Sequence, residues 1–187
     1  MPQRRSRVLR RDQPNGPELM TKIIRPLAGL EDVLRYEPDT GKFFWLVDRP
    51  RKTKAGDLAG HTNKKGYIEI RYNYKSYQAH RIAWYLHTGK DPYPLDIDHI
   101  NGNRADNRIS NLRLATPAQN AKNQPKKQGT TSTYKGVSWY KRHRKWQAQI
   151  RVDGQSIYLG YYDNELEAHL AYCAAAARLH GEFANFG

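Results

Sequence analysis

A stretch without any apolar side chain, QPKKQGTTST at positions 124–133, most constrains what this chain can fold into. Such a segment has nothing to bury, so it is expected to connect two folded parts. Apolar residues make up only 38% of the 187 residues, which allows modest cores. We therefore predict two small domains, residues 27–124 and 134–187. A linker at 125–133 joins them, and a basic flexible tail at 1–26 precedes them.

The charge of the chain indicates a polyanionic partner. Lys and Arg number 32 against 18 Asp and Glu, for a formal net charge of +14. Nucleic acid is the first candidate for such a partner, and double-stranded DNA is the form we expect. The one cysteine, Cys173, excludes an internal disulfide and a cysteine-based zinc cluster. With no apolar run long enough for a membrane span and no secretory signal, we expect a cytoplasmic protein of the host-cell interior.

The first domain is expected to combine short strands with one helix. Strand-like runs occupy 42–47, 66–72 and 75–80, and Asn73-Tyr74 separates the last two as a hairpin turn. The run at 80–88 is typical of a short helix that ends before Gly89.

The second domain is expected to be a three-stranded antiparallel sheet covered by one helix. Strand candidates occupy 134–140, 145–152 and 155–162, and Asp153-Gly154 is a strong hairpin signal between the last two. A helix is expected to start near Asn164 with a capping-box-like Glu167 and to end before Gly181. One of its faces holds mainly small residues, Ala168, Ala171, Tyr172, Ala175 and Leu179. Both domains together give an α+β fold class.

A polar stretch in the first domain, LDIDHINGNRADNRISNLRLATPAQN at 95–120, has the order strand, loop, strand, helix. Thr116, Pro117 and Gln119 form a combined helix-start signal. The order places Asp98 and His99 on the first strand and Asn120 in the first turn of the helix.

These residue types suit the hydrolysis of a phosphodiester. His99 is a candidate general base near neutral pH. Asp98 and Asn120 offer hard oxygen ligands for one divalent ion, Mg²⁺ in the first instance and Mn²⁺ as a possible substitute. Asn111 could form hydrogen bonds across the loop and hold the backbone or ring of His99. EF-hand, HExxH, P-loop and GxSxG patterns do not fit the chain. His80 is expected to be a structural histidine, with a DNA contact as the alternative.

The motif DHINGNRADNRISNLRLATPAQN resembles the HNH nuclease family, in the variant found in phage and intron-encoded homing endonucleases. The resemblance covers roughly residues 30–124 and implies a ββα-metal fold. It implies that His99 is the general base, that Asp98 is the acidic metal ligand, and that Asn111 is the middle asparagine. Asn120 takes the last motif position, which is often histidine in the family.

Basic residues gather on the predicted sheet of the second domain, as expected for a surface that enters a DNA groove. The sequence YKGVSWYKRHRKWQAQIRV and the run that follows resemble the AP2 domain of plant transcription factors, which is also found fused to HNH nucleases in phages. This resemblance implies six DNA contacts, Lys135, Gly136, Ser138, Gln149, Arg151 and Tyr158. Trp139 and Tyr140 are further candidates for aromatic contacts. Target preference does not carry over, because several reading positions differ from the plant domains.

The sequence therefore predicts a metal-dependent DNA endonuclease of the HNH homing type, directed by an AP2-like domain and favoured as a monomer. The main alternative is a non-catalytic DNA-binding regulator in which the HNH unit is a relic. Binding of structured RNA is a third possibility, but it gives no reason for the set of Asp98, His99 and Asn120.

Overall fold

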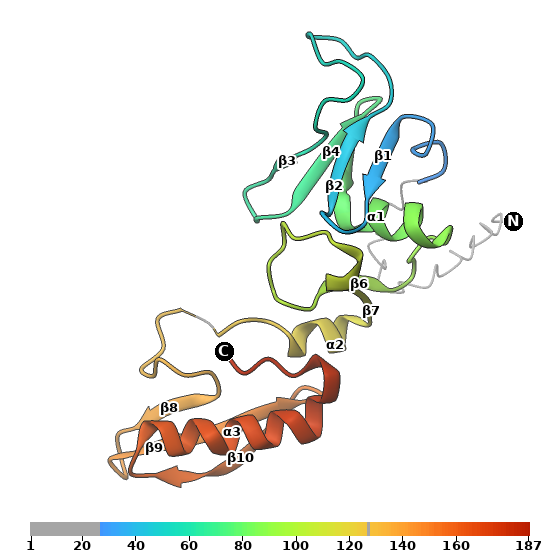
Figure 1. Ribbon diagram of the computed structural model, residues 1–187. Helices are drawn as coiled ribbons and strands as arrows, with labels where there is room; N and C mark the ends of the chain where they lie inside the picture. The colour runs from blue at the N-terminus through green and yellow to red at the C-terminus, as the bar shows by residue number, and fades with distance from the viewer. Residues whose placement is uncertain (1–26, 127) are drawn as a thin grey trace, which may run out of the picture.

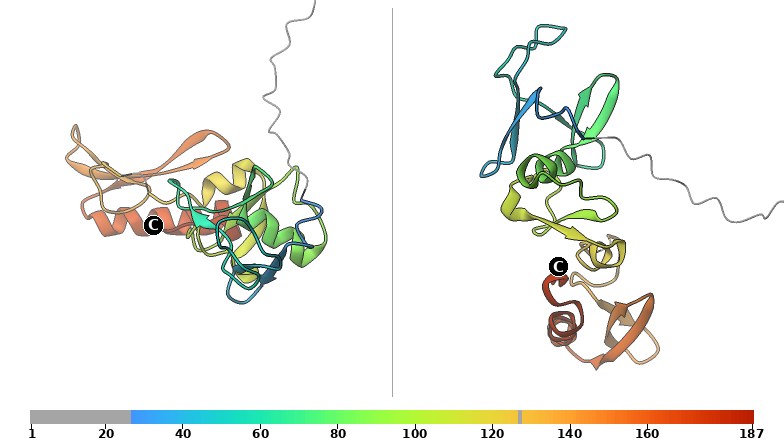
Figure 2. Two further views of the ribbon diagram at one scale, coloured as in Figure 1. Left: turned by 90° about the horizontal axis from the view of Figure 1, so that it is seen from above. Right: turned by 90° about the vertical axis from the view of Figure 1, so that its right-hand side faces the viewer.

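The computed structural model describes residues 27–126 and 128–187, so the predicted basic tail at 1–26 lies outside the described residues. Within these described residues, small antiparallel sheets and three α-helices form an α+β fold, as predicted. The two domains follow one another along the long direction of the molecule, and the last residues return to lie beside α2 (Figures 1 and 2). None of the helices in the described part of the chain is long and apolar enough to cross a membrane.

The first domain begins with two small sheets packed on one helix. Its elements are β1 (Leu34–Glu37), β2 (Lys42–Trp45), β3 (His61–Thr62), β4 (Ile68–Tyr72), β5 (Lys75–Gln78) and α1 (Ala79–Thr88). β1 pairs with β2, and β4 lies between β3 and β5. Phe43, Ile70 and Ile82 are at most 1% exposed and form the centre of this core.

Local signals placed the β4–β5 hairpin and α1 correctly. Asn73 and Tyr74 both have positive φ angles, 47° and 60°, as a two-residue hairpin turn requires. Gly89 caps α1 in the left-handed conformation. The strand predicted at 42–47 ends at Trp45, and the sequence did not predict β1 or β3, which lack clear alternation over their short lengths.

The polar stretch forms a hairpin followed by a helix, consisting of β6 (Asp96–His99), β7 (Leu112–Ala115) and α2 (Pro117–Lys122). Thr116 and Gln119 form the predicted capping box, with Pro117 as the first helical residue. The second strand begins only at Leu112, because residues Ile109–Asn111 form a 3₁₀ turn before it.

The second domain is the predicted three-stranded sheet with one helix. β8 (Val137–Tyr140), β9 (Lys145–Val152) and β10 (Gln155–Tyr162) pair antiparallel, with β9 in the centre. α3 (Glu165–His180) covers one face of this sheet (Figure 1). Its alanines allow close packing, since Ala148 of β9 and Ala168 and Ala176 of α3 are all 0% exposed.

The start of α3 differs in detail from the prediction. Asn164 caps the helix by accepting a hydrogen bond from the backbone N–H of Leu166, not through a capping box with Glu167. Glu165 instead accepts hydrogen bonds from the Ser132 hydroxyl, at 2.6 Å, and from the backbone N–H of Thr133, at 3.0 Å. The end of the predicted linker is thus fastened to the second domain.

Candidate active site

Three of the predicted site residues surround one small cavity in the first domain. Asp98 and His99 end β6, Asn120 lies in α2, and all three line a cavity of about 30 Å³. A space of this size holds about one water molecule or a small ion. The hairpin and the helix therefore bring together a carboxylate, an imidazole and an amide that are up to 22 positions apart in the chain.

Asp98 is buried and makes charge-assisted hydrogen bonds. The β6–β7 register places it directly opposite Arg113. The Nε and Nη2 atoms of Arg113 donate to Asp98 Oδ2 at 2.8 and 2.7 Å. The Asn123 amide nitrogen lies 3.0 Å from Oδ1 and 3.1 Å from Oδ2, and also donates to the His99 backbone carbonyl at 2.8 Å. These hydrogen bonds hold the carboxylate in one orientation.

His99 is 5% exposed and is held through its ring nitrogen. Its Nε2 lies 3.2 Å from the side-chain oxygen of Asn107, which is 1% exposed. Because an amide oxygen only accepts hydrogen bonds, Nε2 carries the proton in the neutral ring and the lone pair remains on Nδ1. Burial lowers the pKa of His99, and the hydrogen bond to Asn107 and the charge of Asp98 oppose this shift. A neutral imidazole at pH 7 can accept a proton.

The Asn111 side chain forms the expected hydrogen bonds across the loop, but the side chain that holds the His99 ring is Asn107. Its amide nitrogen donates to the Asp106 carbonyl at 2.8 Å, and its amide oxygen accepts from the Asn101 backbone N–H at 3.0 Å. Asn111 is the last residue of the 3₁₀ turn, and its side chain closes the loop between β6 and β7 from within. The ring contact belongs to Asn107 instead.

The β1–β2 hairpin supports this loop from outside. The Tyr36 hydroxyl donates to the Asn107 carbonyl at 2.7 Å, and the Ile109 N–H donates to the Pro38 carbonyl at 3.0 Å. Gly41 has a φ of +70°, and a Cβ at this position would lie 2.5 Å from the Arg108 nitrogen. Only glycine allows the two backbones to approach so closely. The loop that carries Asn107 is therefore fixed by residues far away in the sequence.

The donor set around the cavity suits a hard divalent cation. A carboxylate has about four acceptor positions. Asp98 Oδ2 accepts two hydrogen bonds from Arg113 and is also contacted by Asn123, whereas within the described residues Oδ1 accepts a hydrogen bond from Asn123 alone. Oδ1 thus keeps acceptor capacity beside the Asn120 amide, and oxygen ligands of this kind are those that Mg²⁺ prefers. Within the described residues, no group of three His, Cys, Asp or Glu side chains could hold a metal ion, so the candidate pair is one carboxylate and one amide.

Four of the six residues expected to contact DNA lie on the uncovered face of the second domain's sheet. Gln149 pairs with Tyr158, and Arg151 pairs with Ser156, across the β9–β10 ladder. Ser138 pairs with Gln147 across the β8–β9 ladder and shares this face. Tyr158 is 53% exposed, and Gln149 and Arg151 are exposed. The face that α3 leaves open is therefore polar, basic and accessible.

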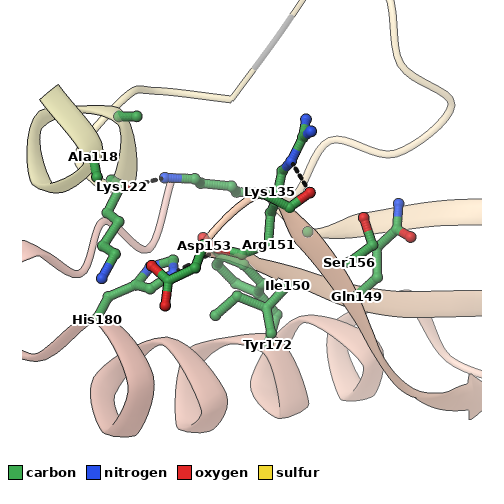
Figure 3. A pocket seen from close by; sticks show the side chains of 13 residues that line it. Ala118, Lys122, Lys135, Gln149, Ile150, Arg151, Asp153, Ser156, Tyr172 and His180 are labelled. Carbon is green, nitrogen blue, oxygen red and sulfur yellow. Dashed lines mark hydrogen bonds between the residues drawn. The ribbon is translucent and has the colours of Figure 1, made fainter.

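Lys135 and Gly136 have different environments from these four residues. The Lys135 ammonium donates to the backbone carbonyls of Lys122 and Gln124, at 3.2 and 2.6 Å, so it caps the end of α2 instead of facing solvent (Figure 3). Burial lowers its pKa to about 8. Gly136 has a φ of +77°, and a Cβ there would lie 2.0 Å from the Tyr172 ring. Both residues have structural roles. The sequence pattern alone does not distinguish such a role from a DNA contact.

The aromatic contacts on the sheet also differ from the prediction. Trp139 packs edge-to-face on Trp146, with ring centroids 5.1 Å apart, and lies on the face opposite to Gln149. On the open face, Tyr161 stacks on Tyr140 at 5.1 Å and contacts Tyr158 at the same distance. Tyr161 was missed because a register shift between Tyr158 and Gly160 changes the face on which the later residues lie.

Sequence reasoning also missed Asn107, Arg113 and Asn123. Arg113 had a usable signal, since pairing His99 with Leu112 places Arg113 opposite Asp98 as an opposite-charge cross-strand pair. Asn107 and Asn123 had no usable signal in the sequence, because the stretch is rich in asparagine and their contacts depend on tertiary packing. His80 is buried, and its ring meets the His99 ring edge-on at 5.2 Å, in keeping with a structural role.

Comparison with known proteins agrees with both halves of this architecture. Residues 77–122 match the HNH endonuclease family, and residues 132–182 match the AP2 domain. The chain is 34% identical over 181 residues to the uncharacterized HNH endonuclease L560 of Acanthamoeba polyphaga mimivirus, a match that covers 91% of this chain and 93% of that protein. It is 33% identical over 114 residues to Protein 3.8 of Escherichia phage T7, covering 60% of this chain and 93% of that protein.

A solved structure of the HNH homing endonuclease I-HmuI, from work on its DNA binding and cleavage, is 27% identical to this chain. That match has a TM-score of 0.40 and covers 54% of this chain and 56% of that one. The family assignment rests on the sequence identity with the mimivirus protein, which extends over nearly the full length of that protein. The chain belongs to the HNH endonuclease family and carries an AP2 domain in its C-terminal part.

Proposed function

We propose that this HNH endonuclease is a metal-dependent enzyme that cleaves double-stranded DNA, and that its AP2 domain anchors it on the target. The observation that carries the proposal is the convergence of Asp98, His99 and Asn120 on one cavity. The positive charge of the chain supports a nucleic-acid substrate.

In this proposal His99 accepts a proton from the attacking water through Nδ1, while Asn107 holds Nε2. Asp98 and Asn120 would hold the ion, and Arg113 and Asn123 keep the Asp98 carboxylate in place. A bound divalent cation would offset the negative charge that develops on the leaving oxygen. Arg104 lines the same cavity, so its guanidinium would lie near a bound phosphate.

The AP2 sheet would read and hold the DNA with the residues of its open face. Gln149 and Arg151 suit base edges or phosphates, and Tyr158 with Tyr161 offers aromatic surface to sugars and bases. Each phosphate contact releases counterions, so the logarithm of the affinity should fall by roughly 0.9 per unit of log salt for each contact. An affinity that does not change with salt would contradict this part of the proposal.

The decisive experiment is incubation with supercoiled plasmid in Mg²⁺ and in EDTA. Cleavage is expected in Mg²⁺ only, with open circles for a nick and linear product for a double break. His99→Ala should retain DNA binding and lose about 10²- to 10⁴-fold in cleavage rate. His87→Ala, which removes an exposed imidazole at the end of α1, is the matched control and should behave like the parent. A parent protein that binds DNA without cutting it would favour the regulator instead.

A further inference from the structure

The C-terminal segment that follows α3 returns to the nuclease domain and contacts two side chains beside its cavity. After α3 the chain runs along α2 (Figure 1). The Glu182 carbonyl accepts a hydrogen bond from Arg113 Nη1 at 2.5 Å, and the Phe183 ring lies 3.9 Å from the centre of the Arg113 guanidinium. The Asn185 amide nitrogen donates to the backbone carbonyl of Asn123 at 3.0 Å and to its side-chain oxygen at 3.3 Å.

Arg113 and Asn123 are the same two side chains that hold Asp98. Arg113 uses Nε and Nη2 for Asp98 and Nη1 for Glu182, so one rigid guanidinium joins the carboxylate to the C-terminal segment. The group is planar, and stacking on Phe183 fixes its plane. A change in the position of the segment would therefore turn the donors that face Asp98.

The hydrogen bond from Asn185 also selects the orientation of the Asn123 amide. The Asn123 side-chain oxygen must face the amide nitrogen of Asn185. If the Asn123 nitrogen faced it instead, two donors would meet without an acceptor. The Asn123 nitrogen then points to Asp98 and to the His99 carbonyl. The opposite orientation would place the Asn123 oxygen against the Asp98 carboxylate, which is repulsive.

We propose that the C-terminal segment, residues 182–185, is a positioning element of the nuclease site, acting on Asp98 through Arg113 and Asn123. This inference rests on the proposed function, in which Asp98 binds the metal ion. The C-terminal part of the chain, from residue 132 onward, then has two separate tasks. Its sheet holds DNA, and its C-terminal segment keeps the metal-binding carboxylate in a productive orientation. Damage to the segment should weaken metal binding and leave DNA affinity unchanged.

The test uses the full chain with Asn185→Leu, which removes the donor at similar size. Phe186→Ala is the matched control, because this residue directly follows the segment and is 47% exposed. Three quantities are measured: Mn²⁺ affinity by electron paramagnetic resonance without DNA, the Mg²⁺ concentration for half-maximal plasmid cleavage, and DNA affinity in EDTA. Asn185→Leu should raise the Mn²⁺ dissociation constant and the half-maximal Mg²⁺ concentration about tenfold, the lower end of the effects of groups that orient metal ligands. DNA affinity should stay within about twofold of the parent, and Phe186→Ala should match the parent in all three.

Parent-like Mn²⁺ affinity and Mg²⁺ dependence in Asn185→Leu would overturn the inference. Asp98→Ala separates this failure from failure of the proposed function. If Asp98→Ala loses Mn²⁺ binding while Asn185→Leu does not, only the positioning role falls. If Asp98→Ala binds Mn²⁺ like the parent, the proposed metal site falls and the inference falls with it. Should Asn185→Leu fail to fold, Asn185→Asp replaces it, since a carboxylate of the same shape also lacks the donor and the same shift is expected.

Discussion

The side-chain oxygen of Asn107 lies 3.2 Å from Nε2 of His99, and both residues are almost fully buried. Asn107 is in turn held by Tyr36, whose hydroxyl donates a hydrogen bond to the Asn107 backbone carbonyl. The imidazole is therefore oriented by a neutral amide and not by a carboxylate. Burial and the hydrogen bond then act in opposite directions on the pKa of His99, and burial prevails. The ring stays neutral at the pH at which it is expected to accept a proton.

Replacement of Asn107 should therefore impair cleavage more than DNA binding. Asn107→Ala removes the acceptor that fixes the proton on Nε2, and we expect a rate loss of about ten- to a hundredfold, as for other groups that orient a histidine. The measurement is single-turnover plasmid cleavage, with circular dichroism to check folding. Asn103→Ala removes an exposed asparagine of the same loop and should cleave like the parent. Parent-like cleavage by Asn107→Ala would rule out the orienting role.

The ion pair between Asp98 and Arg113 should contribute strongly to stability, because removing one partner leaves a buried charge. Side-chain exposure is 5% for Asp98 and 14% for Arg113. Arg113→Ala is expected to lower the free energy of unfolding by about 3–5 kcal/mol. In urea denaturation, the double variant Asp98→Ala with Arg113→Ala should lose less free energy of unfolding than the two single variants lose in total. Lys54→Ala breaks an exposed ion pair and should cause a much smaller change. Additive losses would mean that the two side chains are not coupled.

The buried ammonium of Lys135 should make stability depend on pH in the alkaline range. Its pKa is about 8 in the folded protein, against an ordinary value of 10.5. Between these values the unfolded state binds more protons than the folded state, so this residue makes stability rise with pH. The difference in unfolding temperature between the parent and Lys135→Met should therefore grow in favour of the parent from about pH 8 to about pH 10. Thermal unfolding across this range checks the effect, and a constant difference would refute it.

Gly136 is expected to be required for packing. Gly136→Ala would place a methyl group 2.0 Å from the Tyr172 ring, on a backbone with a positive φ. We expect a loss of more than about 3 kcal/mol in stability, in the range of severe core overpacking with backbone strain. Calorimetry measures the loss. Gly154→Ala is the control, since that glycine also has a positive φ but open space around it. If Gly136→Ala folds like the parent and loses only DNA affinity, a direct DNA contact is the better interpretation.

The elements that depend on local chemistry could be predicted from the sequence. Asn73-Tyr74 and Asp153-Gly154 formed the expected turns, because both residues of each pair adopt positive φ. Thr116, Pro117 and Gln119 started α2, and alternation along β9 separated its covered and open faces. The spacing of Asp98, His99 and Asn120 likewise sufficed to place them around one cavity, since the hairpin and helix that carry them are local structures.

Only the tertiary structure decided which residues support that cavity and what the C-terminal segment contributes to it. Asn107 and Asn111 look alike in the sequence, yet only Asn107 reaches the His99 ring, because contacts with Tyr36 and Gly41 fix the loop that carries it. Lys135 resembled a DNA contact, but the approach of two domains placed its ammonium on the end of α2. Asn185 meets Asn123 across 62 positions of chain. Local propensity acts over a few residues, whereas these contacts depend on how separately folded elements pack.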